Sequence, residues 1–275
     1  MRAEHGLVGH VAAIRHLLRP ILGAWALLLT SFAGCQPPPA PVGPVDHRGR
    51  AIAVRDADEL LQRVLQSNDG YGTLRTVHAV TLELVLGGQR SEKRTFRGVL
   101  AVRRPGHFRL AILGPVGMKL VDLLYMAGKT KVIHVAPELA RSSRLPAILD
   151  SIAADIAAIY RLDPQLYPSR RRLEESVSYA SGRAPLYELK EFRRDELARQ
   201  LTIFAATLAV ARAEVSDERG DSRTIVFGDY ETHGKVLVPR SIHVANEGRA
   251  FYWLAIRVES VDVDVKLDDH LFVAE

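Results

Sequence analysis

The sequence predicts an α+β protein whose main element is a curved antiparallel sheet. Residues 95–126 contain three short runs whose apolar side chains alternate between two faces, and turns follow at Pro105-Gly106 and at 114–117. The run 251–267 also alternates, but its apolar set changes phase near Ser260, which indicates a β-bulge that bends the strand. Residues 146–160 instead follow the spacing of a helix, so the fold combines many strands with an inserted helix.

The N-terminus has the pattern of a bacterial lipoprotein signal peptide. Basic residues, among them Arg15 and Arg19, precede an apolar run at 21–29 that is too short to span a bilayer comfortably. Small residues then lead to Cys35, the only cysteine of the chain, and this arrangement resembles the lipobox, where a diacylglycerol is attached to the thiol. We therefore predict a signal peptide at 1–34 and lipid attachment at Cys35. The alternative is a plain signal peptide with an incidental cysteine.

The segment after Cys35 is rich in proline and has no apolar periodicity. It predicts an extended, semi-rigid tether at 35–52, which leaves 53–275 as the folded domain. Gln36, rather than Asp, follows the cysteine, and by resemblance to enterobacterial sorting rules this favours export to the outer membrane. We therefore expect a protein of the cell envelope that is anchored in the outer membrane and faces the periplasm.

The first half of the folded domain is predicted to be a short helix followed by strands. Asp56 and Asp58 are suited to cap a helix in which Leu61, Val64 and Leu65 form one apolar stripe. Strands are expected at 76–86, as three runs within 95–126, and at 131–135.

The helix predicted at 146–160 is the most apolar one after the signal peptide. Ile148, Ile152 and Ile156 recur at helical spacing, whereas Asp150 and Asp155 are expected to mark its solvent-exposed side. Two interpretations are open: the helix packs on the core, or it is a removable lid over the apolar face of the sheet. The three arginines at 170–172 are expected to form a solvated loop, with contact to a lipid head group as the alternative.

The second half of the domain returns to strands. A turn is expected at 217–221, and strands are expected at 187–190, 200–204, 207–215, 223–230, 236–244 and 251–267. Pro239 lies within one of them and cannot donate a hydrogen bond to a sheet, so it indicates an edge position or a bulge.

Composition and motifs argue against several classes of function. The formal charge is +5, and the first 34 residues contribute three Arg and one Glu, which leaves +3, too little and too dispersed for nucleic-acid binding. The sequence contains no G-x-S-x-G elbow, phosphate-binding loop or H-E-x-x-H motif. His107 and His134 lie within strands, and Asp262 and Asp264 lack a calcium-binding loop, so we expect no metal site and no cofactor. A carboxylate pair assembled by the fold stays open as an enzymatic alternative.

Three motifs give the folded domain a resemblance to the LolA/LolB group of bacterial lipoprotein-sorting proteins. They are Arg104-Pro105, then G-P-V-G at 114–117, then R-x-x-x-F-x-D-Y followed by V-P-R-S-I within 223–242. The similarity covers roughly residue 56 to the C-terminus. It implies an unclosed, strongly curved antiparallel sheet, a half-barrel, wrapped around a few helices that form a lid or plug over an apolar cavity for acyl chains.

The resemblance also implies roles for two loop residues. In LolA, an Arg just before a Pro helps to hold the lid closed, and Arg104 matches this position. In LolB, an apolar residue between Pro and Gly on an exposed loop helps to insert lipoproteins into the bilayer, and Val116 matches it with a smaller side chain than the family's Leu. The residues that we expect to line the acyl-chain cavity are Leu82, Leu84, Leu100, Val102, Phe108, Leu110, Ile112, Leu120, Ile148, Ile152 and Ile156.

The function expected from the sequence is that of a lipid-anchored, non-enzymatic envelope protein that binds the acyl chains of lipids or lipoproteins and receives or inserts lipoproteins at the outer membrane. Its expected partners are the membrane, acyl chains and a periplasmic lipoprotein carrier, without nucleic acid. The first alternative is a scaffold with the same fold, whose cavity is filled by its own side chains and which serves an envelope assembly. The second alternative is a lipid-modifying enzyme.

Overall fold

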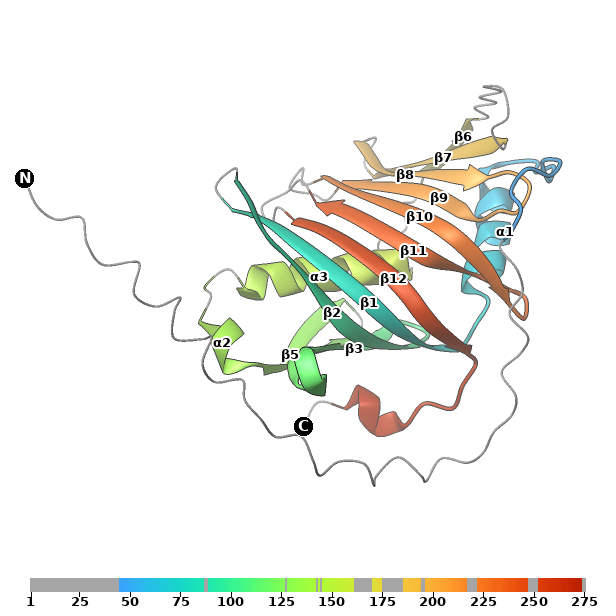
Figure 1. Ribbon diagram of the computed structural model, residues 1–275. Coiled ribbons are helices and arrows are strands. Elements are labelled where there is room, and N and C mark those ends of the chain that lie inside the picture. Colours follow the sequence, from blue (N-terminus) through green and yellow to red (C-terminus); the bar gives the residue numbers. More distant parts are fainter. Residues whose placement is uncertain are drawn as a thin grey trace, which may run out of the picture. The chain divides into compact units, whose positions relative to one another are not determined.

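The computed structural model describes residues 45–86, 89–126, 128–141, 143, 145–160, 170–174, 185–193, 196–216, 222–246 and 252–273 (Figure 1). The predicted signal peptide, Cys35, the first part of the predicted tether and the turn predicted at 217–221 lie outside the described residues. No helix in the described part of the chain is both long enough and apolar enough to cross a membrane.

The described residues form one large sheet, a few helices and two short 3-10 turns, η2 and η4. The elements in chain order are α1 (Ala57–Asp69), β1 (Thr73–Leu86), β2 (Gln89–Arg103), β3 (His107–Leu113), η2 (Pro115–Gly117), β4 (Lys119–Met126), β5 (Lys129–Val135), α2 (Pro137–Ala140), α3 (Leu145–Ile159), β6 (Arg170–Glu174), β7 (Leu186–Arg193), β8 (Glu196–Phe204), β9 (Val210–Ser216), β10 (Ser222–His233), β11 (Val236–Asn246), β12 (Tyr252–Val263) and η4 (Asp269–Phe272).

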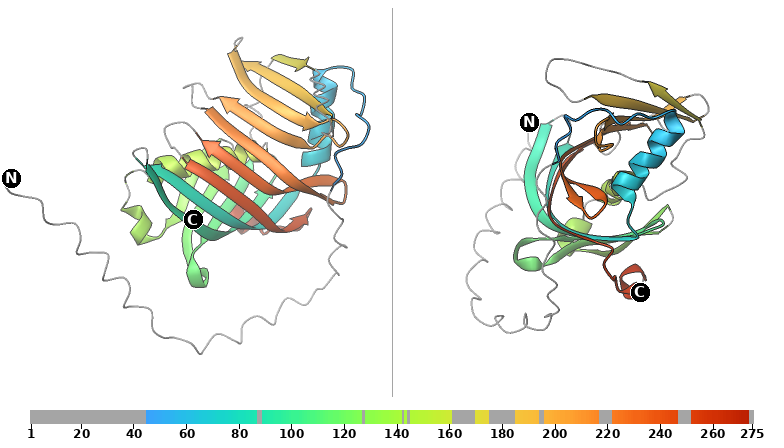
Figure 2. Two further views of the ribbon diagram at one scale, coloured as in Figure 1. Left: turned by 45° about the horizontal axis from the view of Figure 1, so that its top comes forward. Right: turned by 90° about the vertical axis from the view of Figure 1, so that its right-hand side faces the viewer.

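The sheet is antiparallel and does not close on itself. Its twelve strands follow the order β5-β4-β3-β2-β1-β12-β11-β10-β9-β8-β7-β6, so the first strand pairs with the last and the two edges are β5 and β6. The sheet curves around α1 and α3, which lie on its concave side (Figures 1 and 2). The predicted α+β fold, an unclosed curved sheet with a few helices, is confirmed.

Two local predictions about strand geometry are also confirmed. In the β1–β12 ladder Val77 pairs with Ser260 and His78 pairs with Val258, so Glu259 is the extra residue of a bulge at the predicted place. β11 pairs with β12 from Ser241 to Asn246, and Pro239 lies beyond that ladder, where β11 has β10 as its neighbour. The proline therefore occupies a local edge, which is where a residue without an N–H is tolerated.

The loop predicted at 170–172 is wrong, because these residues belong to the edge strand β6. Their backbone pairs with β7, for example Arg171 with Glu191. Pairing satisfies the peptide groups of the segment, and a partner strand that follows later in the chain leaves no mark on the local composition. The short helix α2 was not predicted either; it begins at Pro137, a residue that suits the first helical turn.

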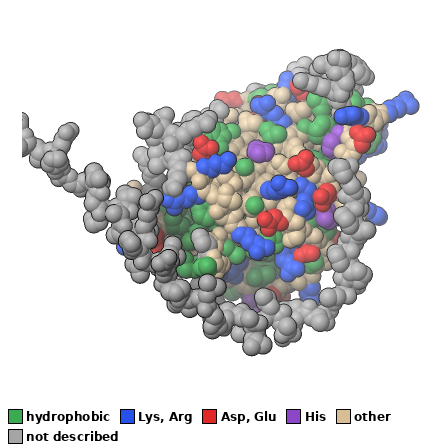
Figure 3. Space-filling view, viewed as in Figure 1, with side chains coloured by type: hydrophobic (Ala, Val, Ile, Leu, Met, Phe, Trp, Pro, Cys, Tyr) green, Lys and Arg blue, Asp and Glu red, His purple; other side chains and the backbone are tan. Residues whose placement is uncertain are grey.

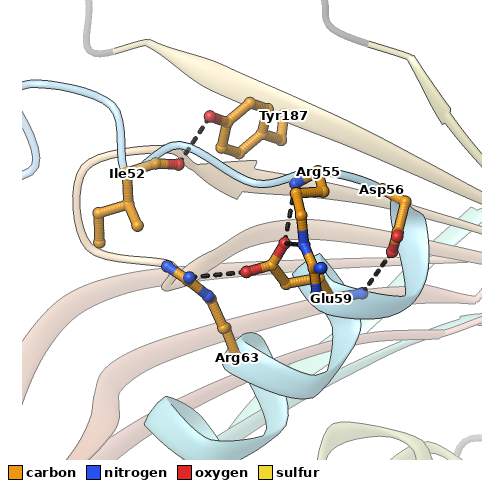
Figure 4. Close-up of polar contacts among 6 residues, drawn as sticks. All are labelled: Ile52, Arg55, Asp56, Glu59, Arg63 and Tyr187. Atoms are coloured by element: carbon orange, nitrogen blue, oxygen red, sulfur yellow. Dashed lines mark hydrogen bonds and ion pairs between the residues drawn. The ribbon is translucent and has the colours of Figure 1, made fainter.

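The chain is fixed to the sheet before α1 begins (Figure 4). The Ile52 N–H donates to the carbonyl of Ala205 at 2.8 Å, and the Tyr187 hydroxyl donates to the Ile52 carbonyl at 2.8 Å. Asp56 then caps α1 as predicted, since its carboxylate accepts the Glu59 N–H at 2.8 Å. The last residues of the predicted tether therefore lie against the folded domain.

The convex face of the sheet carries scattered charged side chains of both signs (Figure 3). Some pair across neighbouring strands, such as Arg75 with Asp262 at 2.8 Å and Arg97 with Glu259 at 3.8 Å. Exposed pairs of this kind contribute little to stability. These charged side chains instead keep the convex face hydrated. The apolar surface of the strands is concentrated on the concave side.

Helix α3 contains a buried carboxylate, which corrects the expectation that Asp155 lies on the solvent-exposed side. Asp150 is exposed as predicted, but Asp155 is completely buried. The Tyr252 hydroxyl donates a hydrogen bond to its Oδ2, and Arg223 Nε lies 3.4 Å from its Oδ1. Both partners come from strands far along the chain, so the helical periodicity alone could not reveal a buried polar position. Burial raises the pKa of Asp155 to about 6, against the opposing effects of Arg223 and of the Tyr252 hydrogen bond.

The raised pKa of Asp155 predicts a pH dependence of stability. Between the ordinary Asp pKa of about 3.9 and the folded value, the folded state binds more protons than the unfolded state. The contribution of Asp155 to the free energy of unfolding should therefore fall as the pH rises from about 4 to about 6 and then level off. Urea denaturation should show that the difference between wild type and Asp155→Asn changes by about 2–3 kcal/mol over this range. Asp150→Asn is the matched control at an exposed position, and its difference from wild type should not change with pH. If the difference between wild type and Asp155→Asn is equally independent of pH, Asp155 is not a buried ionisable group.

Candidate functional site

A largely apolar pocket of about 350 Å³ lies between the concave face of the sheet and helix α3. Its walls come from β1, β2, β3, β4, β12, α2 and α3. The lining residues are His78, Val80, Leu82, Arg94, Phe96, Leu100, Leu110, Ile112, Leu120, Val121, Leu139, Leu145, Ile148, Leu149, Ile152, Ile156, Tyr160, Leu254 and Ile256.

The two periods of the sequence explain how these side chains meet. On β1 and β2 the lining residues are spaced by two or four, so they share the concave face of the sheet. On α3, Ile148, Ile152 and Ile156 are spaced by four and point to the same side of the helix. The pocket is the space that remains where one apolar stripe on the helix faces the apolar surface of the strands.

Most of the residues predicted to line a cavity are brought together in this pocket. They are Leu82, Leu100, Leu110, Ile112, Leu120, Ile148, Ile152 and Ile156. The side chain of Leu84 lies outside the described part of the structure.

Val102 and Phe108 do not line the pocket, contrary to expectation. Both are completely buried in the core, and the ring of Phe108 stacks on that of Tyr125 with centroids 4.9 Å apart. Alternation predicts their face correctly, but it does not say how far along the strand the pocket extends. Beyond Leu100 the concave side is filled by packed side chains.

The sequence interpretation did not place three polar residues in the lining, namely His78, Arg94 and Tyr160. His78 alternates with Val80 on β1, a signal that was available, and Arg94 precedes the residue at which the strand was taken to begin. His78 Nε2 lies 2.6 Å from the Thr76 hydroxyl oxygen, and Thr76 also hydrogen-bonds Tyr160. Burial lowers the pKa of His78 to about 4 and raises that of Tyr160 to about 12. Both side chains are therefore neutral at physiological pH.

Arg104 connects the C-terminal ends of α1 and α3. Its Nη2 donates to the carbonyl of Tyr160, the residue after α3, at 2.7 Å and to the carboxylate of Asp69, the last residue of α1, at 2.7 Å. Its guanidinium also lies 4.6 Å from the centre of the Tyr71 ring. The last carbonyls of a helix lack partners and carry partial negative charge, so a guanidinium is well suited to this position.

The turn between β3 and β4 presents an exposed apolar side chain. Val116 is 97% exposed and has φ 56° and ψ 19°, a left-handed conformation that is unfavourable for a β-branched residue. Met118 is also exposed, and the Gly114 N–H closes the turn on the Met118 carbonyl at 2.8 Å. A Cβ atom at Gly114 would lie 3.1 Å from the side chain of Leu120, which is part of the pocket wall. The exposed turn therefore adjoins the pocket.

The chemistry that this arrangement supports is the binding of hydrocarbon. No group of three or more His, Cys, Asp or Glu side chains that could hold a metal ion occurs within the described residues. The His78 ring nitrogen that contacts Thr76 is engaged in a structural hydrogen bond. What the pocket offers a ligand is mainly apolar surface, with a few polar side chains.

Comparison with known proteins identifies the fold. No protein-family model and no curated protein matches the sequence. Among solved structures, a LolA superfamily protein from Nitrosomonas europaea is 10% identical with a TM-score of 0.52, covering 80% of this chain and 98% of that one. A putative outer membrane lipoprotein-sorting protein domain from Vibrio parahaemolyticus is 12% identical (TM-score 0.47), and a DUF1329 family protein from Desulfovibrio piger is 16% identical (TM-score 0.48); each covers 79% of this chain and 95% of its own. The chain therefore shares its fold with the LolA superfamily protein from Nitrosomonas europaea, and this is the fold that its motifs indicated.

Proposed function

We propose that this protein binds acyl chains of lipids or lipoproteins in the pocket beneath α3, while a lipid on Cys35 attaches it to a membrane of the bacterial envelope. The observation that carries the proposal is the apolar pocket of about 350 Å³, walled by the sheet on one side and by α3 on the other. The shared fold with a LolA superfamily protein is consistent with this role.

Desolvation supplies the affinity in this proposal, and no covalent step is required. Each methylene that leaves water contributes about 0.8 kcal/mol, so a chain of about ten methylenes gains about 8 kcal/mol before the cost of ordering it. A gain of this size corresponds to a dissociation constant of about 1 μM at the tightest, and the ordering cost weakens it, so binding is reversible. Reversible binding is what a protein needs if it must later release the lipid.

Helix α3 serves as the lid in this proposal. Its C-terminal half is held by polar contacts, through Asp155 to the sheet and through the Tyr160 carbonyl to Arg104. Its N-terminal half contributes Leu145, Ile148 and Leu149 to the pocket wall, where the contacts are apolar and non-directional. Opening at the N-terminal end would expose the pocket while Arg104 keeps the other end in place.

The turn at 114–118 is the transfer surface in this proposal. Val116 and Met118 are exposed apolar side chains, and the turn adjoins the pocket wall at Leu120. A membrane contact there would bring the bilayer to the side of the pocket. The protein would thus receive a lipoprotein from a periplasmic carrier and insert it at the outer membrane, to which the lipid on Cys35 attaches it.

Filling part of the pocket should weaken lipid binding. Ile148→Trp places an indole in the pocket from a half-buried helical position, whereas Val132→Trp adds the same group to an exposed residue outside the lining. Displacing two or more methylenes of the ligand weakens binding by about tenfold or more. Titration with a fluorescent fatty acid should show this loss for Ile148→Trp and not for Val132→Trp, with circular dichroism to confirm that both variants fold.

Mass spectrometry of organic extracts from the purified protein separates this proposal from its first alternative. Co-purifying lipid supports the carrier. If the wild type binds no acyl probe, its extract contains no lipid and a protein partner co-purifies, the scaffold function replaces the one proposed.

The proposed transfer role of the turn can be tested at Val116, whose left-handed backbone conformation is strained. Val116→Gly removes the apolar side chain and also relieves the left-handed conformation, so it should stabilise the protein by about 1 kcal/mol. We expect the same variant to deliver bound lipid to liposomes more slowly than wild type, and Val116→Leu to deliver at least as fast. Stability is measured by urea denaturation and delivery by transfer of a fluorescent lipid. Equal delivery rates in all three proteins would remove the turn from the mechanism.

Replacement of Cys35 tests the anchor. Cys35→Ser cannot be acylated, so the variant should accumulate as an uncleaved precursor or as a soluble periplasmic form. Fractionation and mass measurement of the N-terminus distinguish these outcomes from the acylated wild type. Membrane fractionation and processing identical to those of wild type would refute lipid attachment at Cys35.

A further inference from the structure

The volume of the pocket limits how many acyl chains it can hold. An engineered protein cavity of about 150 Å³ binds one benzene molecule. The pocket here, at about 350 Å³, is a little more than twice as large, so it has room for about a dozen carbon atoms. That is one acyl chain, and two or three chains would require the lid to open widely.

The lining also has a direction, because exposure decreases along β2. Arg94, Phe96 and Leu100 lie on the same face of this strand; Arg94 is exposed, Phe96 is half-buried and Leu100 is buried. Arg94 pairs with Leu82 across to β1, and Leu82 is half-buried as well. The pocket therefore has a water-accessible end at Arg94 and a deep end near Leu100.

The charge of the lining is confined to the accessible end. Among the lining residues that the structure describes, Arg94 is the one that carries a permanent charge. At the deep end, His78 is buried, and its Nε2 contacts the Thr76 hydroxyl at 2.6 Å. The lowered pKa of His78 keeps its ring neutral, so a charged group has no counterpart there.

We propose that the pocket selects a single-chain lipid with an anionic head group. Arg94 binds the head group, and the one acyl chain of the lipid extends toward Leu100. This inference rests on the proposed acyl-chain binding. Of the two kinds of ligand named there, it specifies the lipid, because the diacylglyceryl group of a lipoprotein has two chains and no acidic head group. A guanidinium binds a carboxylate or a phosphate through paired hydrogen bonds, so a fatty acid and a single-chain phospholipid share the chemistry that Arg94 recognises. The neutral deep end accepts the methyl end of the chain.

The test compares dodecyl ligands that differ in the head group. Dodecanoate and dodecyl phosphate should displace a fluorescent acyl probe about fivefold more effectively than dodecan-1-ol, since a partly exposed ion pair contributes modestly. High salt should reduce this preference because it screens the charge. The stronger of the two anions tells whether the natural head group is a carboxylate or a phosphate, and didodecyl phosphate should bind more weakly than dodecyl phosphate if one chain is the limit.

Two variants on the same strand assign the effect to Arg94. Arg94→Gln should bind dodecan-1-ol as wild type does and lose the preference for the anions. Arg97→Gln is the matched control, because Arg97 lies on the convex face beside Glu259 and should leave the preference intact. If wild type binds dodecanoate, dodecyl phosphate and dodecan-1-ol equally, or if Arg94→Gln keeps the preference, the head-group inference is overturned while acyl-chain binding stands. If no dodecyl ligand binds at all, the proposed function itself fails.

Discussion

A sheet that curves without closing has a concave face that something other than the sheet must cover, and this constraint organises the protein. Around α1 the cover is dense, with Leu60 and Val64 completely buried in the core. Around α3 it is incomplete. The small residues Ala153 and Ala157 are buried, but the stripe that includes Ile148 and Ile152 borders a space that the described side chains leave unfilled. The pocket is thus a consequence of covering a long curved face with a few helices.

The position of α3 depends on two polar contacts as well as on its apolar stripe. Asp155 and the Tyr160 carbonyl are both near the C-terminal end of the helix, and they contact Tyr252 and Arg104 respectively. Buried polar contacts of this kind have strict geometry, whereas apolar contacts tolerate sliding and separation. The C-terminal part of the helix is therefore held by directional contacts, whereas its N-terminal part contributes apolar side chains to the pocket wall. This asymmetry is the physical basis for proposing a lid that opens at one end.

The sequence predicts what depends on local periodicity, and it fails where the cause is distant in the chain. Alternation identified the strands and even the bulge at Glu259, because a one-residue phase slip is visible within a single strand. Asp155 was misassigned because its partners lie on β10 and β12, and β6 was missed because its pairing with β7 has no local signature. Val102 was predicted on the right face and in the cavity lining, but it lies outside the pocket, because periodicity gives the face of a residue and not its position along the pocket.

Two features of the molecule are costly for stability, and they are neighbours. An unfilled apolar cavity destabilises a core by about 24 cal/mol per Å³, so side chains that filled even part of the pocket would stabilise the fold by several kcal/mol. Val116 adds the cost of a left-handed β-branched residue at a turn that glycine would suit better. The turn and the pocket wall meet at Leu120. Packing offers no reason for both departures to occur side by side, whereas a protein that binds a hydrocarbon chain and transfers it to a membrane requires a space for the chain and an apolar contact next to it.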